Sequence, residues 1–241
     1  MKGFKPIPAN PKISVLIVLG LSMLIGTAAP AVAGSWFKVA GGYSGMAMDD
    51  INNGDFSFYD YPDDTPGGFD FPTLDGGFSL SFHLGYDLSP KFSLGFSWDK
   101  QYARLEGTDE DITANLDLDA NFFMVHGYWR PLRSEKWDFG GAAGLGFAFP
   151  SGNVKVTGQD NVNYGQGDTS GNAAFALEIM ALMDYYLSQT SALEVTLGYR
   201  SAVIKDLKVD NTPVYNEDGS LLALDYTGYI FKLGYKYIFG N

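Results

Sequence analysis

The stretch YIFKLGYKYIF, from Tyr229 to Phe239, decides how the rest of the chain is interpreted. Every second residue in it is aromatic or leucine, and the residues between them include Lys232, Gly234 and Lys236. A period of two is that of a β-strand, because successive side chains point to opposite faces of a sheet. The stretch therefore predicts a strand with one unbroken apolar face, and the remaining chain must indicate what covers that face.

Composition favours an all-β protein and excludes several kinds of chemistry. The chain has 241 residues, 30 glycines, 15% aromatic residues, no cysteine and a formal net charge of -12. Aromatic residues combined with many glycines favour short strands and tight turns. The absence of cysteine excludes a disulfide scaffold, a thiol nucleophile, a thiolate metal site and a lipid-anchoring cysteine. The acidic balance argues against a nucleic-acid partner.

Residues 1–33 have the pattern of a cleaved export signal. Lys2, Lys5 and Lys12 precede an apolar run that begins at Ile13, and small residues at 31–33 precede an expected cut before Gly34. A retained membrane helix is the alternative, although the run is slightly shorter than the ~20 residues that a span needs. Cleavage would leave residues 34–241 as a single domain with a net charge of -15, because three lysines are lost from the total of -12.

The expected mature chain alternates bulky apolar residues with small or polar ones throughout. In 78–86 the phenylalanines, leucines and tyrosine share one face while Ser79, Ser81, His83 and Gly85 share the other. The same reading predicts eight strands, near 36–48, 77–88, 92–106, 114–129, 137–149, 173–187, 192–204 and 224–239. The connections at 89–91, 130–136 and 188–190 are short, and those after the first, fifth and seventh strands are long. The loop after the third strand, at 107–113, is shorter than this pattern expects. An antiparallel up-and-down β-barrel has such connections.

The small residues indicate which face of the barrel points outward. A soluble, lipocalin-like barrel also alternates but places its apolar face inside, around a ligand. In this chain the non-apolar face is mostly Gly, Ala and Ser, as at Gly140, Ala142, Gly144, Gly146 and Ala148, which suits a narrow interior rather than a solvated surface. The bulky face then lies outside and needs lipid to cover it, which predicts an eight-stranded transmembrane barrel.

On these features the chain resembles the small eight-stranded outer-membrane barrels of Gram-negative bacteria, the OmpA/OmpX-like and opacity-protein-like group. The resemblance implies a monomer in the cell outer membrane, in contact with lipid and lipopolysaccharide. It also implies that the terminal aromatic residues are read by the outer-membrane assembly machinery, here Tyr235, Tyr237 and Phe239. It implies no peptidoglycan-binding second domain.

The sequence offers little catalytic chemistry. His83 and His126 are both mid-strand, in expected separate parts of the barrel, and no spacing indicates a triad or a zinc site. We therefore expect no enzyme activity, no cofactor and no metal. The glycines at 140–146 lack the helix that a phosphate-binding loop requires. The acidic segment Asp49–Asp75 has three interpretations: a charged surface loop, a divalent-cation site, or aromatic contacts with lipid headgroups or a partner.

Charged residues on the inward face predict ion pairs that fill the lumen. Counting parity places seven of them inside: Lys38, Glu178, Asp184, Glu194, Arg200, Lys232 and Lys236. Glu178 and Arg200 lie equally far from Gln189 in the predicted turn, so they should be cross-strand neighbours, and Glu194 should face Lys232 or Lys236. Static filling and a gate are both compatible with this network. The predicted function is a structural or adhesion-like barrel; the alternative is a narrow channel for small or hydrophobic solutes.

Overall fold

The protein is described by a computed structural model that covers residues 34–52, 56–57, 72–109, 112–158, 163–216 and 219–239. The predicted export signal at 1–33 lies outside these residues, as does most of the acidic segment between Asp49 and Asp75.

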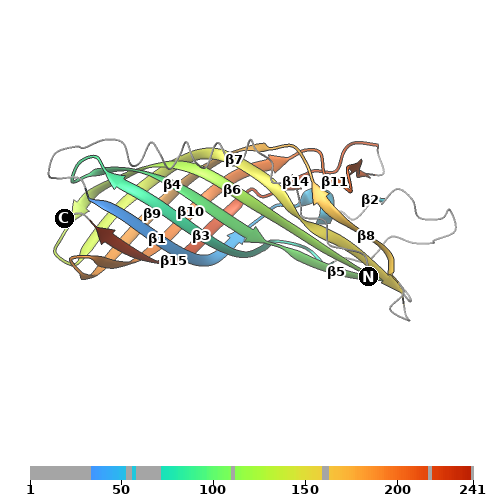
Figure 1. Cartoon of the computed structure of the whole chain (residues 1–241), viewed down its shortest axis with the longest axis horizontal. Helices are drawn as coiled ribbons and strands as arrows, with labels where there is room; N and C mark the ends of the chain where they lie inside the picture. Colours follow the sequence, from blue (N-terminus) through green and yellow to red (C-terminus); the bar gives the residue numbers. More distant parts are fainter. Residues whose placement is uncertain are drawn as a thin grey trace, which may run out of the picture.

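Eight strands form a closed antiparallel barrel in this part of the chain, so the predicted fold class is confirmed (Figure 1). They are β1 (Ser35–Gly45), β3 (Gly76–Asp87), β4 (Phe92–Tyr102), β6 (Ile112–Arg133), β7 (Trp137–Gly158), β9 (Ala174–Ser188), β10 (Ser191–Ile204) and β15 (Gly228–Phe239). Each strand pairs with its neighbours in the chain order of the barrel. Closure is made by β1 and β15, which pair from Ser35 with Phe239 to Ser44 with Ile230.

The remaining elements gather at one end of the barrel, which we call the loop end (Figure 1). They are α2 (Asp49–Asn52), β2 (Phe56–Ser57), β5 (Arg104–Asp109), β8 (Asn163–Ser170), β11 (Lys208–Val209), β12 (Thr212–Pro213), β13 (Tyr215–Asn216) and β14 (Leu224–Asp225). The opposite end, the turn end, holds the short connections at 88–91, 134–136 and 189–190. Within the described residues, no helix is long and apolar enough to cross a bilayer.

Two predicted strand boundaries are wrong, and each lies next to a proline through which the strand continues. The predicted turn at 130–136 begins only after Arg133, and the strand passes Pro131 through a register shift between Trp129 and Leu132. A bulge of this kind tolerates the missing amide of proline. Likewise β7 continues past Pro150 to Gly158, so much of the predicted long loop after the fifth strand is β-structure formed with β8.

The loop after the third strand is short because the sheet continues there. β4 is followed by β5, which pairs with β6 from Arg104 with Asp117 to Asp109 with Ile112. β6 and β7, each 22 residues long, therefore extend beyond the other barrel strands at the loop end. The polar residues in the extended parts of β6 and β7 mark a face of the strand that is in contact with solvent, not the end of the strand.

The apolar face of each barrel strand points outward, as predicted. Along β15, Tyr229, Phe231, Leu233, Tyr235, Tyr237 and Phe239 are between 45% and 77% exposed. The alternate residues Ile230, Lys232 and Lys236 are buried inside. Exposed Phe82, Trp129, Leu145, Ile179 and Leu197 continue the apolar surface on other strands. Such a band is stable only when lipid covers it.

The interior has a polar half at the turn end and an apolar half at the loop end. Charged and hydroxyl side chains line the polar half, together with a small apolar cluster of Trp36, Tyr128, Ala142, Met180 and Leu182. One buried apolar cluster, which we call the loop-end core, fills the other half; it includes Leu105, Leu116, Leu118, Phe122, Met124, Val154, Val156, Ile204, Leu207, Leu222, Leu224 and Tyr226. Side chains therefore occupy both halves of the barrel, and a cavity of about 180 Å³ remains at the turn end.

The closing seam gives the first testable prediction. A Cβ atom at Gly42 in β1 would lie 2.0 Å from the carbonyl oxygen of Phe231 and 2.7 Å from Cα of Lys232. These are backbone atoms, so the seam must open slightly to accept even a methyl group. We expect Gly42→Ala to convert from the compact to the unfolded gel mobility at a lower temperature than the wild type, which should itself be heat-modifiable.

Gly127 provides the control, because a Cβ atom there meets nothing within 4 Å. Gly127→Ala should retain the wild-type transition temperature on the same gel. Equal transition temperatures for Gly42→Ala and the wild type would contradict the tight seam.

Candidate functional site

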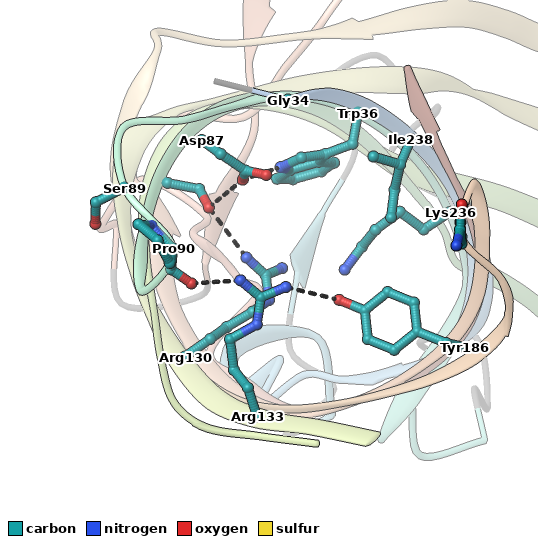
Figure 2. Close-up of a pocket in the computed structure, with 12 residues that line it drawn as sticks. Gly34, Trp36, Asp87, Ser89, Pro90, Arg130, Arg133, Tyr186, Lys236 and Ile238 are labelled. Carbon is teal, nitrogen blue, oxygen red and sulfur yellow. Dashed lines mark hydrogen bonds between the residues drawn. The ribbon is translucent and has the colours of Figure 1, made fainter. Parts of the chain in front are cut away.

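Five charged side chains meet inside the barrel near the turn end. We call them the turn-side cluster: Lys38, Arg130, Asp184, Glu194 and Lys236. Lys38 Nζ lies 2.5 Å from Glu194 Oε1, and Lys236 Nζ lies 3.2 Å from Glu194 Oε2. Arg130 Nε donates to Asp184 Oδ2 at 3.1 Å, and Lys236 also forms an ion pair with Asp184. Figure 2 shows Arg130 and Lys236 reaching into the lumen from different strands.

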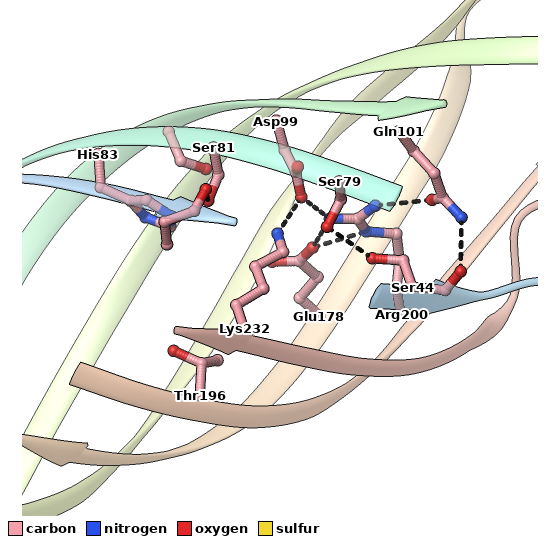
Figure 3. A network of polar contacts seen from close by, with 12 residues as sticks. Ser44, Ser79, Ser81, His83, Asp99, Gln101, Glu178, Thr196, Arg200 and Lys232 are labelled. Atoms are coloured by element: carbon pink, nitrogen blue, oxygen red, sulfur yellow. Dashed lines mark hydrogen bonds and ion pairs between the residues drawn. The ribbon is translucent and has the colours of Figure 1, made fainter. Parts of the chain in front are cut away.

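A second group lies farther along the lumen and is organised by Arg200 (Figure 3). We call it the central cluster: Asp99, Gln101, His126, Glu178, Arg200 and Lys232. Arg200 Nε donates to Glu178 Oε1 at 2.6 Å, and its Nη1 donates to Gln101 Oε1 at 3.2 Å. Asp99 forms ion pairs with both Arg200 and Lys232. Figure 3 shows these groups converging from β4, β9, β10 and β15.

Two histidines and a tyrosine connect the clusters. His83 Nδ1 lies 3.1 Å from the Tyr128 hydroxyl, and the rings of His83 and His126 are 5.8 Å apart between centroids. The expectation that the two histidines occupy separate parts of the barrel is therefore wrong. They lie on β3 and β6, which flank β4, and curvature of the wall brings their inward side chains together. Arg130 of the turn-side cluster lies over the Tyr128 ring, 5.3 Å from its centroid, so the two clusters adjoin through ring contacts.

His126 lies between Ser97 and Glu178 in this part of the lumen and contacts both side chains, an arrangement that the sequence did not indicate. His126 Nε2 lies 2.8 Å from Glu178 Oε2, and its Nδ1 lies 3.5 Å from Ser97 Oγ. The order of groups resembles a serine, base and acid triad. All three side chains are buried in the filled lumen, however, so a substrate cannot reach the serine in this conformation.

The predicted lumen residues all lie inside the barrel. Glu178 pairs directly across from Arg200 in the β9–β10 ladder. Glu194 contacts Lys236 and Lys38, whereas Lys232 turns to Asp99.

Two charged members of the network were missing from the predicted set. The parity of β4 already placed Asp99 inward, so its alternation was an available signal. Arg130 was not predicted to face the lumen because the sequence analysis placed it in a turn, whereas it lies in β6.

The charges are arranged so that each buried cation of the two clusters meets a carboxylate. Removing an ion from water costs several kcal/mol even after relaxation, and only close partners with additional hydrogen bonds offset that cost. Asp184 and Glu194 each contact two or more cations, and Asp99 serves both Arg200 and Lys232. The result is a network in which shared carboxylates cross-link cations from different strands.

The loop end is closed by a folded cap over the loop-end core. Tyr226 is fully buried, and its hydroxyl donates to the carbonyl oxygen of Leu118 at 3.0 Å. Burial, and after it the charge of Asp119, raises the pKa of Tyr226, so the hydroxyl stays protonated and remains a donor. Asp50 accepts hydrogen bonds from the amide of Ala223 and the side chain of Asn216. This carboxylate of the acidic segment thus has a structural role.

Metal binding by the acidic segment stays a prediction. Among the described residues, no group of three or more His, Cys, Asp or Glu side chains could hold a metal ion. Most of the segment lies outside that part of the chain.

The geometry defines a class of protein: a closed eight-stranded β-barrel with an apolar outer band and a side-chain-filled lumen, of the outer-membrane type. No protein-family model matches the chain, and no curated protein matches it either.

Solved structures with a similar fold are small outer-membrane barrels. OprG from Pseudomonas aeruginosa is 13% identical with a TM-score of 0.47, and the match covers 88% of this chain and 99% of that one. Ail of Yersinia pestis is 12% identical with a TM-score of 0.44, covering 86% and 99%. Neisserial surface protein A is 10% identical with a TM-score of 0.45, covering 86% and 99%. At these values the similarity says nothing about a ligand or a partner.

The central cluster gives the second prediction. Glu178→Ala should lower the free energy of unfolding by about 3 kcal/mol, because Arg200 and His126 lose a buried carboxylate partner. Glu178→Gln keeps the shape and one acceptor, so it should lose less. Denaturant titration of the folded protein in detergent, followed by tryptophan fluorescence, measures the difference.

The exposed pair of Arg104 with Asp117 is the matched control, since Arg104 Nε lies 2.6 Å from Asp117 Oδ1 in solvent. Arg104→Ala should leave the unfolding midpoint unchanged within error. If Glu178→Ala behaved like this control, the central cluster would not contribute to stability as argued.

Proposed function

We propose that this protein is an outer-membrane barrel with a structural or surface-interaction role, and that its lumen passes no solute in the resting state. The observation that carries the proposal is that both halves of the barrel interior are occupied by side chains. The polar half is cross-linked by ion pairs around Arg200 and Glu194, and the apolar half is packed by the loop-end core. A porin instead leaves an aqueous channel through a wider barrel.

The loop end is the surface that we propose for interaction. β5, β6, β7 and β8 form a sheet there beyond the main barrel, and its inward face packs on the loop-end core. Its outward face is polar and includes Arg104, Lys155 and Gln166 as exposed side chains. A rigid, water-facing sheet suits a contact with another molecule better than a mobile loop does, because less conformational entropy is lost on binding.

Export and assembly form a further part of the proposal. Residues 1–33 would be removed as a signal, leaving residues 34–241 as one barrel domain. Tyr235, Tyr237 and Phe239 lie outward on β15, where an assembly machinery or lipid could contact them. We place the protein as a monomer in the Gram-negative outer membrane, with lipid and lipopolysaccharide around the apolar band.

A narrow channel is the second candidate. It is favoured by a cavity of about 180 Å³ at the turn end, which opens toward the polar half of the lumen. A solute entering there would meet the turn-side cluster, the central cluster and then the loop-end core. Passage would require ion pairs to exchange partners and the core to open.

Conductance separates the two candidates. In planar bilayers the wild type should show little or no steady conductance. Arg200→Ala loosens the central cluster but leaves the loop-end core in place, so its conductance should also stay low. A large, stable wild-type conductance would contradict the closed lumen and support the channel.

Orientation gives a further prediction. The loop end should face the cell exterior and the turn end the periplasm. Because the chain has no cysteine, single substitutions can be labelled without background. A membrane-impermeant maleimide applied to intact cells should label Gln166→Cys at the loop end and spare Ser134→Cys at the turn end. Both sites are exposed in the structure, so labelling of Ser134→Cys alone would invert the orientation.

A further inference from the structure

The cavity at the turn end, which we call the turn-end cavity, is lined by side chains from most of the wall. Its volume is about 180 Å³, and its lining includes Trp36, Asp87, Ser93, Arg130, Arg133 and Lys236 (Figure 2). These residues come from β1, β3, β4, β6 and β15. The cavity is therefore built by the closed barrel itself and not by one flexible turn.

The charge that faces this cavity is predominantly positive. Three of its lining residues are cations and one is a carboxylate, Asp87. The carboxylates that pair with the three cations, Asp138, Asp184 and Glu194, are not among the lining residues. Asp87 is already engaged, because its Oδ1 accepts from Ser93 Oγ at 2.6 Å and from Trp36 Nε1 at 3.2 Å. The paired acids thus lie behind the cations as seen from the cavity.

Arg130 retains an unused donor at this site. Arg130 is 7% exposed. Its Nε donates to Asp184, and its Nη1 donates to Ser93 Oγ at 3.1 Å. Its Nη2 is buried without a hydrogen-bond partner, and the Glu194 carboxylate oxygen near it is 3.9 Å away. A buried, charged N–H group without a close acceptor is costly, so the hydrogen-bonding capacity of Arg130 is not fully met by its protein partners.

Arg133 extends the donor set to the mouth of the cavity. Its side chain is 45% exposed, and its Nη1 donates to the carbonyl oxygen of Pro90 at 2.6 Å. Figure 2 shows the Arg130 and Arg133 side chains side by side, with Lys236 reaching into the same space. Planar guanidinium groups are suited to oxyanions, and a nearby ammonium adds a point charge.

We propose that the turn-end cavity is a binding site for a small oxyanion of the phosphate type, held by Arg130, Arg133 and Lys236. The oxyanion enters from the water at the turn end, since the loop-end core closes the other side. A free phosphate and a lipid phosphate group share this chemistry. The site is independent of whether the loop end binds a partner.

The test uses inorganic phosphate and the full barrel in a non-ionic detergent without lipid. Trp36 lines the cavity, so its indole N–H resonance serves as the reporter in a titration at constant ionic strength. We expect a saturable shift in the wild type. Arg133→Gln should weaken the apparent affinity by about tenfold, the loss expected for one charge-assisted hydrogen bond. Because Arg133 is half exposed, this variant should still fold, which its unboiled gel mobility checks.

Arg104→Gln is the matched control, because it removes an exposed arginine at the loop end. Its titration should match that of the wild type. A second arm repeats the titration in nanodiscs of anionic phospholipid: loss of the phosphate response there identifies a lipid phosphate group as the occupant, and retention identifies a free anion. The proposal is overturned by a non-saturating wild-type shift, or by equal affinities for the wild type and Arg133→Gln.

Discussion

Hydrocarbon offers no water to a free backbone amide, so a sheet that faces lipid must give every strand two neighbours. In this chain the requirement is met by β1 and β15, which are far apart in sequence and pair over ten residue positions. All other features depend on that seam. Once the sheet closes, the inward face becomes a narrow space that must be filled, and the outward face becomes a continuous apolar band.

The chain fills this space in two physically different ways. At the loop end, apolar side chains pack together and remove their own surface from water, which favours the folded state directly. At the turn end, charges are buried, and their cost is offset only because they are cross-linked through shared carboxylates such as Asp99 and Glu194. The first half stabilises the fold through burial of apolar surface, whereas in the second half the loss of one partner would leave a buried charge uncompensated.

This division gives the two ends of the barrel different chemistry. The loop end is a packed cap whose outer face is polar, and any partner there meets a surface. The turn end retains a cavity in which cations outnumber carboxylates, and any partner there meets a pocket. A solute that entered from the turn end would find donors first and a closed apolar core beyond them.

The sequence by itself determined the strands and their faces, because alternation with a period of two is local. It also determined the position of Glu178 opposite Arg200 by counting from Gln189, and this count holds because a register shift between Ser191 and Ala192 follows the turn. Only the tertiary structure decided which charges meet across the lumen. Asp99 in β4 and Lys232 in β15 are separated by β1 and β3, yet they pair, and His83 approaches His126 over the intervening strand. These contacts depend on the curvature and stagger of the closed sheet, which arise only when all strands are paired. Arg130 shows the same limit: Pro131 marks a turn locally, but pairing with β7 carries the strand past it through a bulge.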